Sequence, residues 1–145
     1  MKKVKEFYLS CRDGEKLEQT AITSSFLAAE YCRNFYFEDL EIYESFFLLM
    51  LNPSNVVIGW AKIAQGGVST TVVDPKIIAK FAIDSLCTNV ILCHNHPSGN
   101  TKPSEADKSL TRRIKDGLLL FDIKTLDHII LTKNSYFSFS DEGLI

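Results

Sequence analysis

One segment, residues 89–121, constrains the fold of this chain more than any other. It begins with "NVILC", an apolar run of the length of a short buried strand, which leads directly into His94. The stretch "PSGN" after His96 is rich in turn formers. Apolar side chains then recur at helical spacing within 104–121, at Leu110, Ile114, Leu118 and Phe121. The segment therefore predicts a buried strand, a turn and an amphipathic helix in succession.

The rest of the chain alternates between strand and helix patterns. Strands are expected over residues 6–11, 44–52, 56–64, 89–93, 124–132 and 136–140, with a further β-branched stretch at 69–73. Helices are expected over 20–36, 75–86 and 104–121, the second starting at a proline that suits a first helical position. The short turns "PSN" and "KNS" predict two hairpins. This interleaving predicts an α/β fold, or an α+β fold with an antiparallel part.

Length, composition and charge narrow the class of protein. The 145 residues, 46% of them hydrophobic, predict a single globular domain over 1–145. The formal net charge of −2 makes direct nucleic-acid binding unlikely, because proteins that neutralise phosphates are usually basic. The N-terminus lacks the apolar core of a signal peptide, and no apolar run approaches the roughly 18 residues of a membrane span. We therefore expect a cytoplasmic protein whose cysteines are reduced core residues.

Two of the three histidines stand one residue apart at the end of the apolar run. Side chains alternate along a strand, so His94 and His96 should point to one side and Asn95 to the other. Asp107 falls in the first turn of the next helix, which can bring its carboxylate back to the two imidazoles. Two histidine nitrogens and one carboxylate oxygen are a ligand set of catalytic Zn²⁺ sites, which leave one position for water. The pattern predicts a zinc site.

The full spacing H-x-H-x7-S-x2-D, made by His94, His96, Ser104 and Asp107, resembles the signature of the JAB/MPN (JAMM) metalloprotease superfamily. The wider match is to its RadC-like JAB domains. "HNHPSGNTKPSEADKSLTRRIK" is similar to their core motif, "ESFFLLMLN" to their upstream strand, and "LDHIIL" and "SFSDEGLI" to their C-terminal hairpin. The resemblance covers about residues 20–145. It implies a single JAB/MPN-type, cytidine-deaminase-like domain with a mixed β-sheet flanked by helices.

The resemblance also implies an activity. It predicts a zinc-dependent hydrolase of the JAMM metallopeptidase type, which cleaves an amide or isopeptide bond of an unidentified peptide or protein with a metal-activated water. Glu44 matches the position of the general base, with Glu41 as the fallback. Ser104 would support the oxyanion, and it also suits a helix N-cap. The alternative is a non-catalytic metal-binding module that acts in DNA repair or recombination, or in protein interaction.

The chain departs from the family pattern in three places. Asn95 stands where deubiquitinating members often have Ser or Thr, as is usual for the RadC-like branch. Lys76 and Ile77 replace an Arg-Glu pair typical of that branch, which weakens any expectation about contacts of that helix. With about 40 residues before Glu44, we also expect no N-terminal helix-hairpin-helix region. Two further residues are read as structural: Cys93 should pack in the core, and His128 is expected to be a satisfied core histidine rather than a support for the metal ligands.

Overall fold

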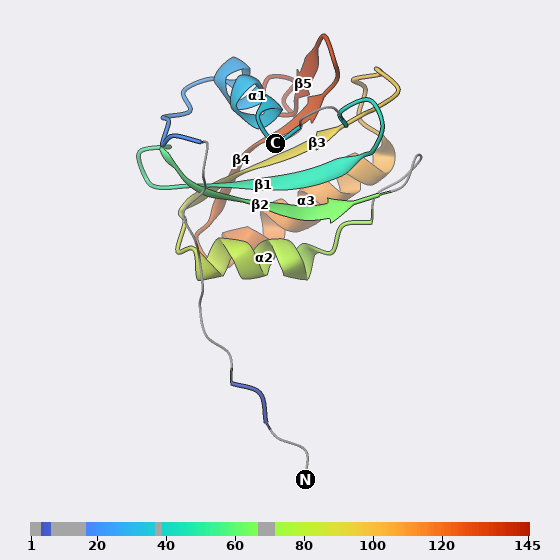
Figure 1. Cartoon of the computed structure of the whole chain (residues 1–145). Helices are drawn as coiled ribbons and strands as arrows, with labels where there is room; N and C mark the ends of the chain where they lie inside the picture. The colour runs from blue at the N-terminus through green and yellow to red at the C-terminus, as the bar shows by residue number, and fades with distance from the viewer. Residues whose placement is uncertain (1–3, 7–16, 37–38, 67–71) are drawn as a thin grey trace.

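The computed structural model describes residues 4–6, 17–36, 39–66 and 72–145. The strand predicted at 6–11 and the β-branched stretch at 69–73 fall largely outside these residues. The helices are α1 (Ser25–Arg33), α2 (Pro75–Asp84) and α3 (Glu105–Leu119). The strands are β1 (Ser45–Leu51), β2 (Val57–Gln65), β3 (Asn89–Asn95), β4 (Lys124–Leu131) and β5 (Tyr136–Ser138). In Figure 1, α1 lies above the sheet and α2 and α3 lie below it.

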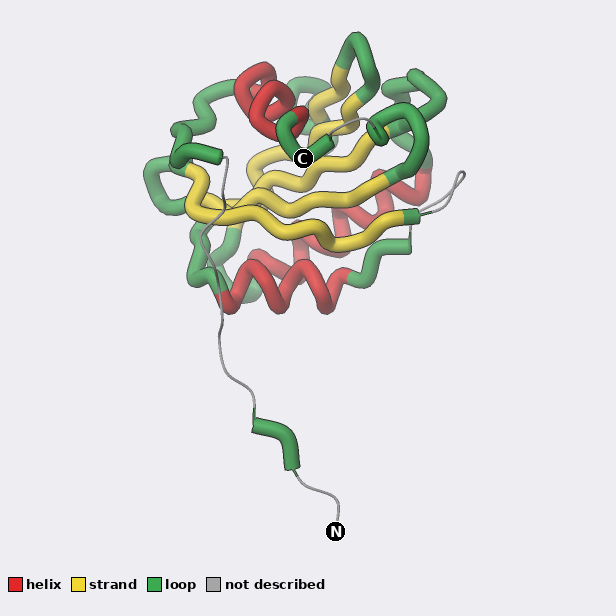
Figure 2. Tube along the Cα trace, viewed as in Figure 1, coloured by secondary structure: helices red, strands yellow, loops and turns green. Residues whose placement is uncertain are grey.

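The strands form one mixed sheet in the order β2-β1-β3-β4-β5 (Figure 2). β1 pairs antiparallel with both β2 and β3, and β4 pairs antiparallel with β5. β3 and β4 are parallel, and α3 provides the crossover that a parallel pair requires. The predicted α/β fold with a mixed sheet and flanking helices is confirmed, and both predicted hairpins are present.

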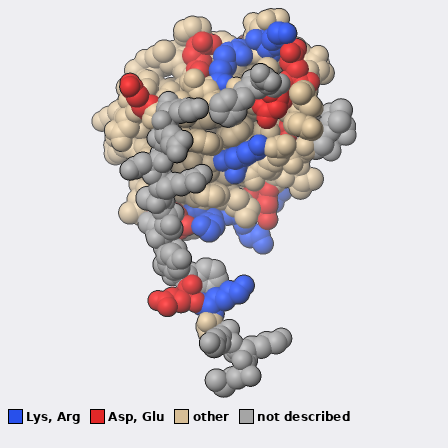
Figure 3. Space-filling model, viewed as in Figure 1, with Lys and Arg blue, Asp and Glu red and all other residues tan. Residues whose placement is uncertain are grey.

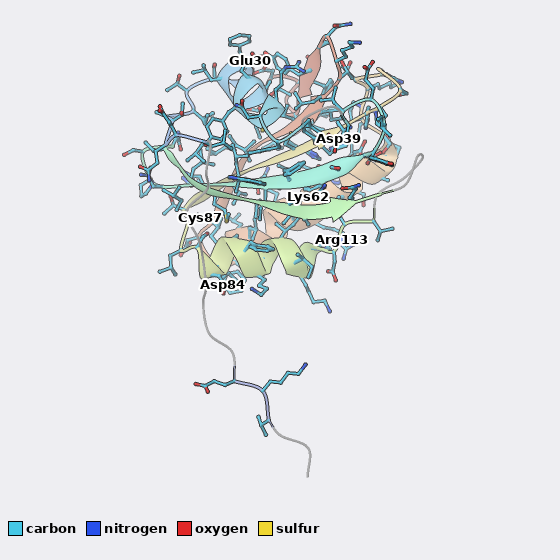
Figure 4. The ribbon with its side chains drawn as sticks, viewed as in Figure 1. Glu30, Asp39, Lys62, Asp84, Cys87 and Arg113 are labelled. Atoms are coloured by element: carbon cyan, nitrogen blue, oxygen red, sulfur yellow. The ribbon has the colours of Figure 1, made fainter. Side chains whose placement is uncertain are left out.

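Each face of the sheet carries its own apolar core. On the α1 face, residues of α1 such as Ala29 and Cys32 pack on Phe47, Leu49 and Ile91. On the other face, the buried residues come from both helices and from the middle of the sheet: Ile78 and Ala82 of α2, Ile114 and Leu118 of α3, and Phe46, Leu48 and Leu92 of the sheet. Side chains fill both spaces between helices and sheet (Figure 4). The domain therefore has three layers.

Two sequence expectations need correction. The helix expected over 20–36 is confined to Ser25–Arg33, because the Ser24 side chain caps it by accepting from the Leu27 N–H. The residues before the cap extend the sheet instead, since Ala21 forms a bridge with Val56. Phe121, expected on the buried face of the last long helix, is 58% exposed. α3 ends at Leu119, and the chain turns so that Ile123 enters the core instead.

Candidate metal centre

The strand β3 sets the direction of both histidines. It runs to Asn95, two residues further than predicted, so His94 lies within the sheet beside Phe46 of β1 and Ile130 of β4. The backbone N–H of His96 donates to the Leu131 carbonyl, which extends the contact with β4. The imidazole nitrogens Nε2 of His94 and His96 lie 3.0 Å apart. The predicted convergence of the two imidazoles is confirmed.

The helix α3 delivers the carboxylate. Ser104 is its N-cap, with its Oγ accepting from the Asp107 N–H at 3.0 Å, while Asp107 Oδ2 accepts from the Ser104 N–H at 2.8 Å. This reciprocal capping box holds the Asp107 side chain against the start of its own helix. From there, Asp107 Oδ1 lies 3.4 Å from His94 Nε2, and Oδ2 lies 3.5 Å from His96 Nε2. His94, His96 and Asp107 thus form a group that could hold a metal ion, with ligand atoms within 4.8 Å of one another.

Hydrogen bonds behind the ligands assign the tautomer of His94. The Thr111 hydroxyl donates to the Asp107 carbonyl at 2.6 Å, so its oxygen accepts from His128 Nδ1 at 2.7 Å. His128 Nε2 is then the acceptor for the Nδ1–H of His94, also at 2.7 Å. The lone pair of His94 is left on Nε2, which faces Asp107.

A backbone carbonyl assigns the same tautomer to His96. His96 Nδ1 lies 2.7 Å from the Asn100 carbonyl, which can only accept, so Nδ1 carries the proton and Nε2 carries the lone pair. Gly99, at φ 85°, lets the loop fold back by donating its N–H to the His96 carbonyl. Two imidazole lone pairs and one carboxylate therefore converge on one point. This donor set fits a divalent transition metal, because a cation there offsets the repulsion among the three ligand groups.

Two pKa shifts bear on the charges around the ligand group. Burial raises the pKa of Asp107, but its contacts with the imidazoles of His94 and His96 and with the Ser104 backbone outweigh burial and hold that pKa well below its usual range. Burial, with a smaller contribution from the neighbouring His94, lowers the pKa of His128 well below the histidine range. Asp107 is thus ionised and His128 neutral at pH 7, as the hydrogen-bond pattern requires.

The two candidate glutamates occupy different places. Burial lowers the pKa of His96, but Asp107, the Asn100 carbonyl and the charge of Glu44 together raise it above the usual value. Glu44, half-buried directly before β1, therefore acts electrostatically on the ligand group. Glu41 instead pairs with Lys133 at 3.2 Å, beside a recess of about 230 Å³ lined by residues of the loop after His96 and the β4–β5 turn. Of the two, Glu44 has the electrostatic link to the histidines.

Of the two residues interpreted as structural, Cys93 is one and His128 is not. Cys93 is fully buried in the α1-face core, away from the histidines, as predicted. His128 is buried, but it is more than a core histidine, because it contacts His94 directly. Thr111 was missed altogether. A signal was present, since Thr111 is a polar residue one turn after Asp107 on the helix face that carries Ile114 and Leu118 into the core.

The charged side chains form no single field on the face drawn in Figure 3, where basic and acidic groups are interspersed. Among the described helices, none combines the length and apolar character needed to cross a membrane. On this face, the domain that carries the site has a surface of mixed charge.

Comparison with known proteins shows the family. Residues 22–144 match the model of the RadC-like JAB domain, and the chain belongs to this family, with a single JAB-type domain. It is 46% identical over 102 residues to a UPF0758 protein of Flavobacterium johnsoniae, an alignment that covers 70% of this chain and 44% of the relative. It is 41% identical over 102 residues to the UPF0758 protein YfjY of Escherichia coli K12, covering 70% and 64% of the two chains. A UPF0758 protein of Fusobacterium nucleatum is 40% identical over 129 residues, covering 88% and 54%. The matched regions thus span less than two thirds of the length of these relatives.

Proposed function

We propose that this domain is a zinc-dependent hydrolase of the JAMM metallopeptidase type, which cleaves an amide or isopeptide bond of a peptide or protein. The observation that carries the proposal is the convergence of His94 Nε2, His96 Nε2 and the Asp107 carboxylate, each held by a partner behind it. Membership of the RadC-like JAB family supports it. The net charge of −2 and the mixed charges in Figure 3 favour a peptide or protein over a nucleic acid as the partner.

His94, His96 and Asp107 would hold the ion. When bound, Zn²⁺ lowers the pKa of water toward 7 and polarises a carbonyl. Glu44 is the base in this proposal: its carboxylate takes a proton from the attacking water and delivers it to the leaving amine. Ser104 supports the oxyanion. Its Oγ accepts from the Asp107 N–H, which leaves its own hydrogen free to be donated to the carbonyl oxygen as negative charge develops there.

The test pairs metal analysis with cleavage of a peptide library. Wild-type protein loaded with zinc should cleave members of the library. Glu44→Gln should retain zinc and lose about 10²–10⁴-fold in turnover, because an amide cannot accept the water's proton. Glu41→Gln is the matched control and should cleave at the wild-type rate.

Two outcomes would contradict this assignment. Activity that survives in Glu44→Gln and is lost in Glu41→Gln would make Glu41 the base. Wild-type protein with stoichiometric zinc that leaves the whole library intact would instead support the non-catalytic metal-binding module.

A further inference from the structure

Asn95, the residue between the two candidate ligand histidines, is fully buried, and strand alternation turns its side chain to the face of the sheet opposite theirs. Its side-chain amide makes three short hydrogen bonds. Nδ2 donates to the carbonyls of Leu40 and Tyr43, both at 2.7 Å, and Oδ1 accepts from the Ser45 N–H at 2.8 Å. An amide nitrogen has two protons, so both are used.

The three partners of Asn95 lie on both sides of Glu44 in the sequence: Leu40 and Tyr43 precede it, and Ser45 follows it. The ladder between β1 and β3 has its last pair at Phe46 and His94, one residue short of Ser45 and Asn95. The Asn95 side chain therefore takes the place of the next backbone pair, and it binds the chain on both sides of Glu44. The segment before β1 is a turn rather than a strand, so its position depends on such contacts.

Two further hydrogen bonds complete the attachment. The Gly66 N–H donates to the Glu44 carbonyl at 2.8 Å, and the Tyr36 hydroxyl donates to the Ser45 carbonyl at 2.8 Å. Neither of these two hydrogen bonds involves β3, so neither fixes the distance between the Glu44 segment and β3. The Asn95 side chain thus links the segment around Glu44 directly to the strand that carries the histidines.

We propose that Asn95 is a positioning residue, which holds Glu44 at a set distance from the ion bound by His94 and His96. This inference rests on the proposed function for the role of Glu44. The positioning of Glu44 can be separated from metal binding, because the Asn95 side chain lies on the α1 face and the candidate ligands lie on the α2/α3 face. Loss of the amide should therefore misplace the base and leave the metal ligands in position.

The test uses Asn95→Ala and the milder Asn95→Ser, whose single hydroxyl cannot reach two carbonyls at once. The matched control is Asn89→Ala. Asn89 is a buried asparagine at the other end of β3, and it donates to the Asn52 carbonyl at 3.3 Å and to Asn55 Oδ1 at 2.8 Å. Each substitution removes the hydrogen bonds of a buried asparagine on β3, so an effect that comes only from lost stability should appear in both variants.

Three measurements are made on the full chain: zinc affinity, steady-state cleavage of a peptide taken from the library, and the ¹³C resonance of the Glu44 carboxyl with and without Zn²⁺. We expect Asn95 variants to bind zinc as wild type does and to lose about 10²-fold in kcat at unchanged KM, the scale of a misplaced group. The Glu44 resonance, identified by its absence in Glu44→Gln, should respond to Zn²⁺ in wild type and much less in the Asn95 variants. Asn89→Ala should match wild type per folded molecule.

The outcomes separate the two proposals. Cleavage by Asn95→Ser at the wild-type kcat would overturn the positioning role, as would an equal loss in Asn89→Ala. If wild type cleaves nothing, the proposed function fails, and Asn95 is judged by the carboxyl resonance alone. A Zn²⁺ response of Glu44 that is equal in wild type and Asn95→Ser then overturns the positioning role, and a diminished one supports it.

Discussion

The two faces of the sheet are built from alternate residues of the same strands, yet they bury different chemistry. The α1 face is apolar and aromatic over most of its area. Phe35 stacks on both Phe47 and Trp60, with ring centroids 4.9 Å away in each case, and the rings of Phe47 and Trp60 lie 6.0 Å from each other. The α2/α3 face begins in the same way and then, at the carboxyl end of β3, gives way to His94 and His128.

Aromatic rings cover the buried histidines at the polar end of that face. Phe46 stacks on His94 with centroids 5.8 Å apart, and Phe139 stacks on His128 at 4.7 Å. Buried polar groups are costly unless they are hydrogen-bonded, and here His94, His128 and Thr111 satisfy one another in series. The apolar packing of the α1 face thus stabilises the fold, whereas the α2/α3 face also orients the candidate ligand atoms. Substitutions on the two faces should therefore have separable effects.

The largest effect is expected at the ligand itself. His94→Ala removes one of three ligands and leaves His96 and Asp107 alone, so protein purified without chelator should lose the near-stoichiometric zinc expected of wild type. Elemental analysis of both proteins, prepared in parallel at neutral pH, measures this. Equal zinc in the two would place the metal elsewhere.

Ser104, at the start of α3, comes next. Ser104→Ala should cost about 1 kcal/mol of stability through the lost cap, and about 10²–10³-fold in kcat through the lost oxyanion donor. Ser104→Asp separates the two roles, because it can still cap the helix but repels a developing oxyanion. Chemical denaturation and cleavage assays measure both quantities. A stable and fully active Ser104→Asp would show that Ser104 is only a cap.

A smaller effect is expected one step behind the ligands. Thr111→Val removes the acceptor for His128, so the tautomer of His94 is no longer enforced, and zinc affinity should fall about 10–100-fold. Thr111→Ser keeps the hydroxyl and should bind as wild type does. The measurement is competition with a chelating zinc indicator.

A control is available on β4. Thr125 is buried, and its Oγ has no hydrogen-bond partner among the described residues, so Thr125→Val removes a hydroxyl of the same kind without breaking a contact there. Its zinc affinity should be unchanged. If Thr111→Val and Thr125→Val bind zinc equally, the Thr111–His128–His94 series does not orient the ligand.

The smallest effect is expected on the opposite face, next to a ligand in sequence. Cys93→Ala should cost on the order of 1 kcal/mol by leaving a small gap in the α1-face core, and should leave zinc affinity unchanged. Denaturation and zinc competition on the same preparation test the separation of the faces. A marked loss of zinc affinity in Cys93→Ala would show that the two faces are coupled through β3.

Much of the fold could be predicted because its signals are local. Apolar runs and turn formers located β1, β3 and the two hairpins, and the spacing of Ser104 and Asp107 indicated the start of α3, because a cap involves residues within one turn. The errors also have local causes. Phe121 continued the helical spacing, but the chain leaves the helix at Leu119, so periodicity alone placed one residue too many on the buried face.

The candidate ligands can be recognised from the sequence alone, because strand alternation sends His94 and His96 to one side and one turn of helix carries Asp107. Their orientation, in contrast, depends on contacts between segments that lie far apart in the sequence. His128 reaches His94 from 34 positions away, and Asn95 reaches Ser45 from 50 positions away. Such contacts depend on the register between strands and on the packing of α3 against the sheet, which no local pattern specifies. The tautomers of the ligands, and the link between Glu44 and β3, exist only once those distant segments have met.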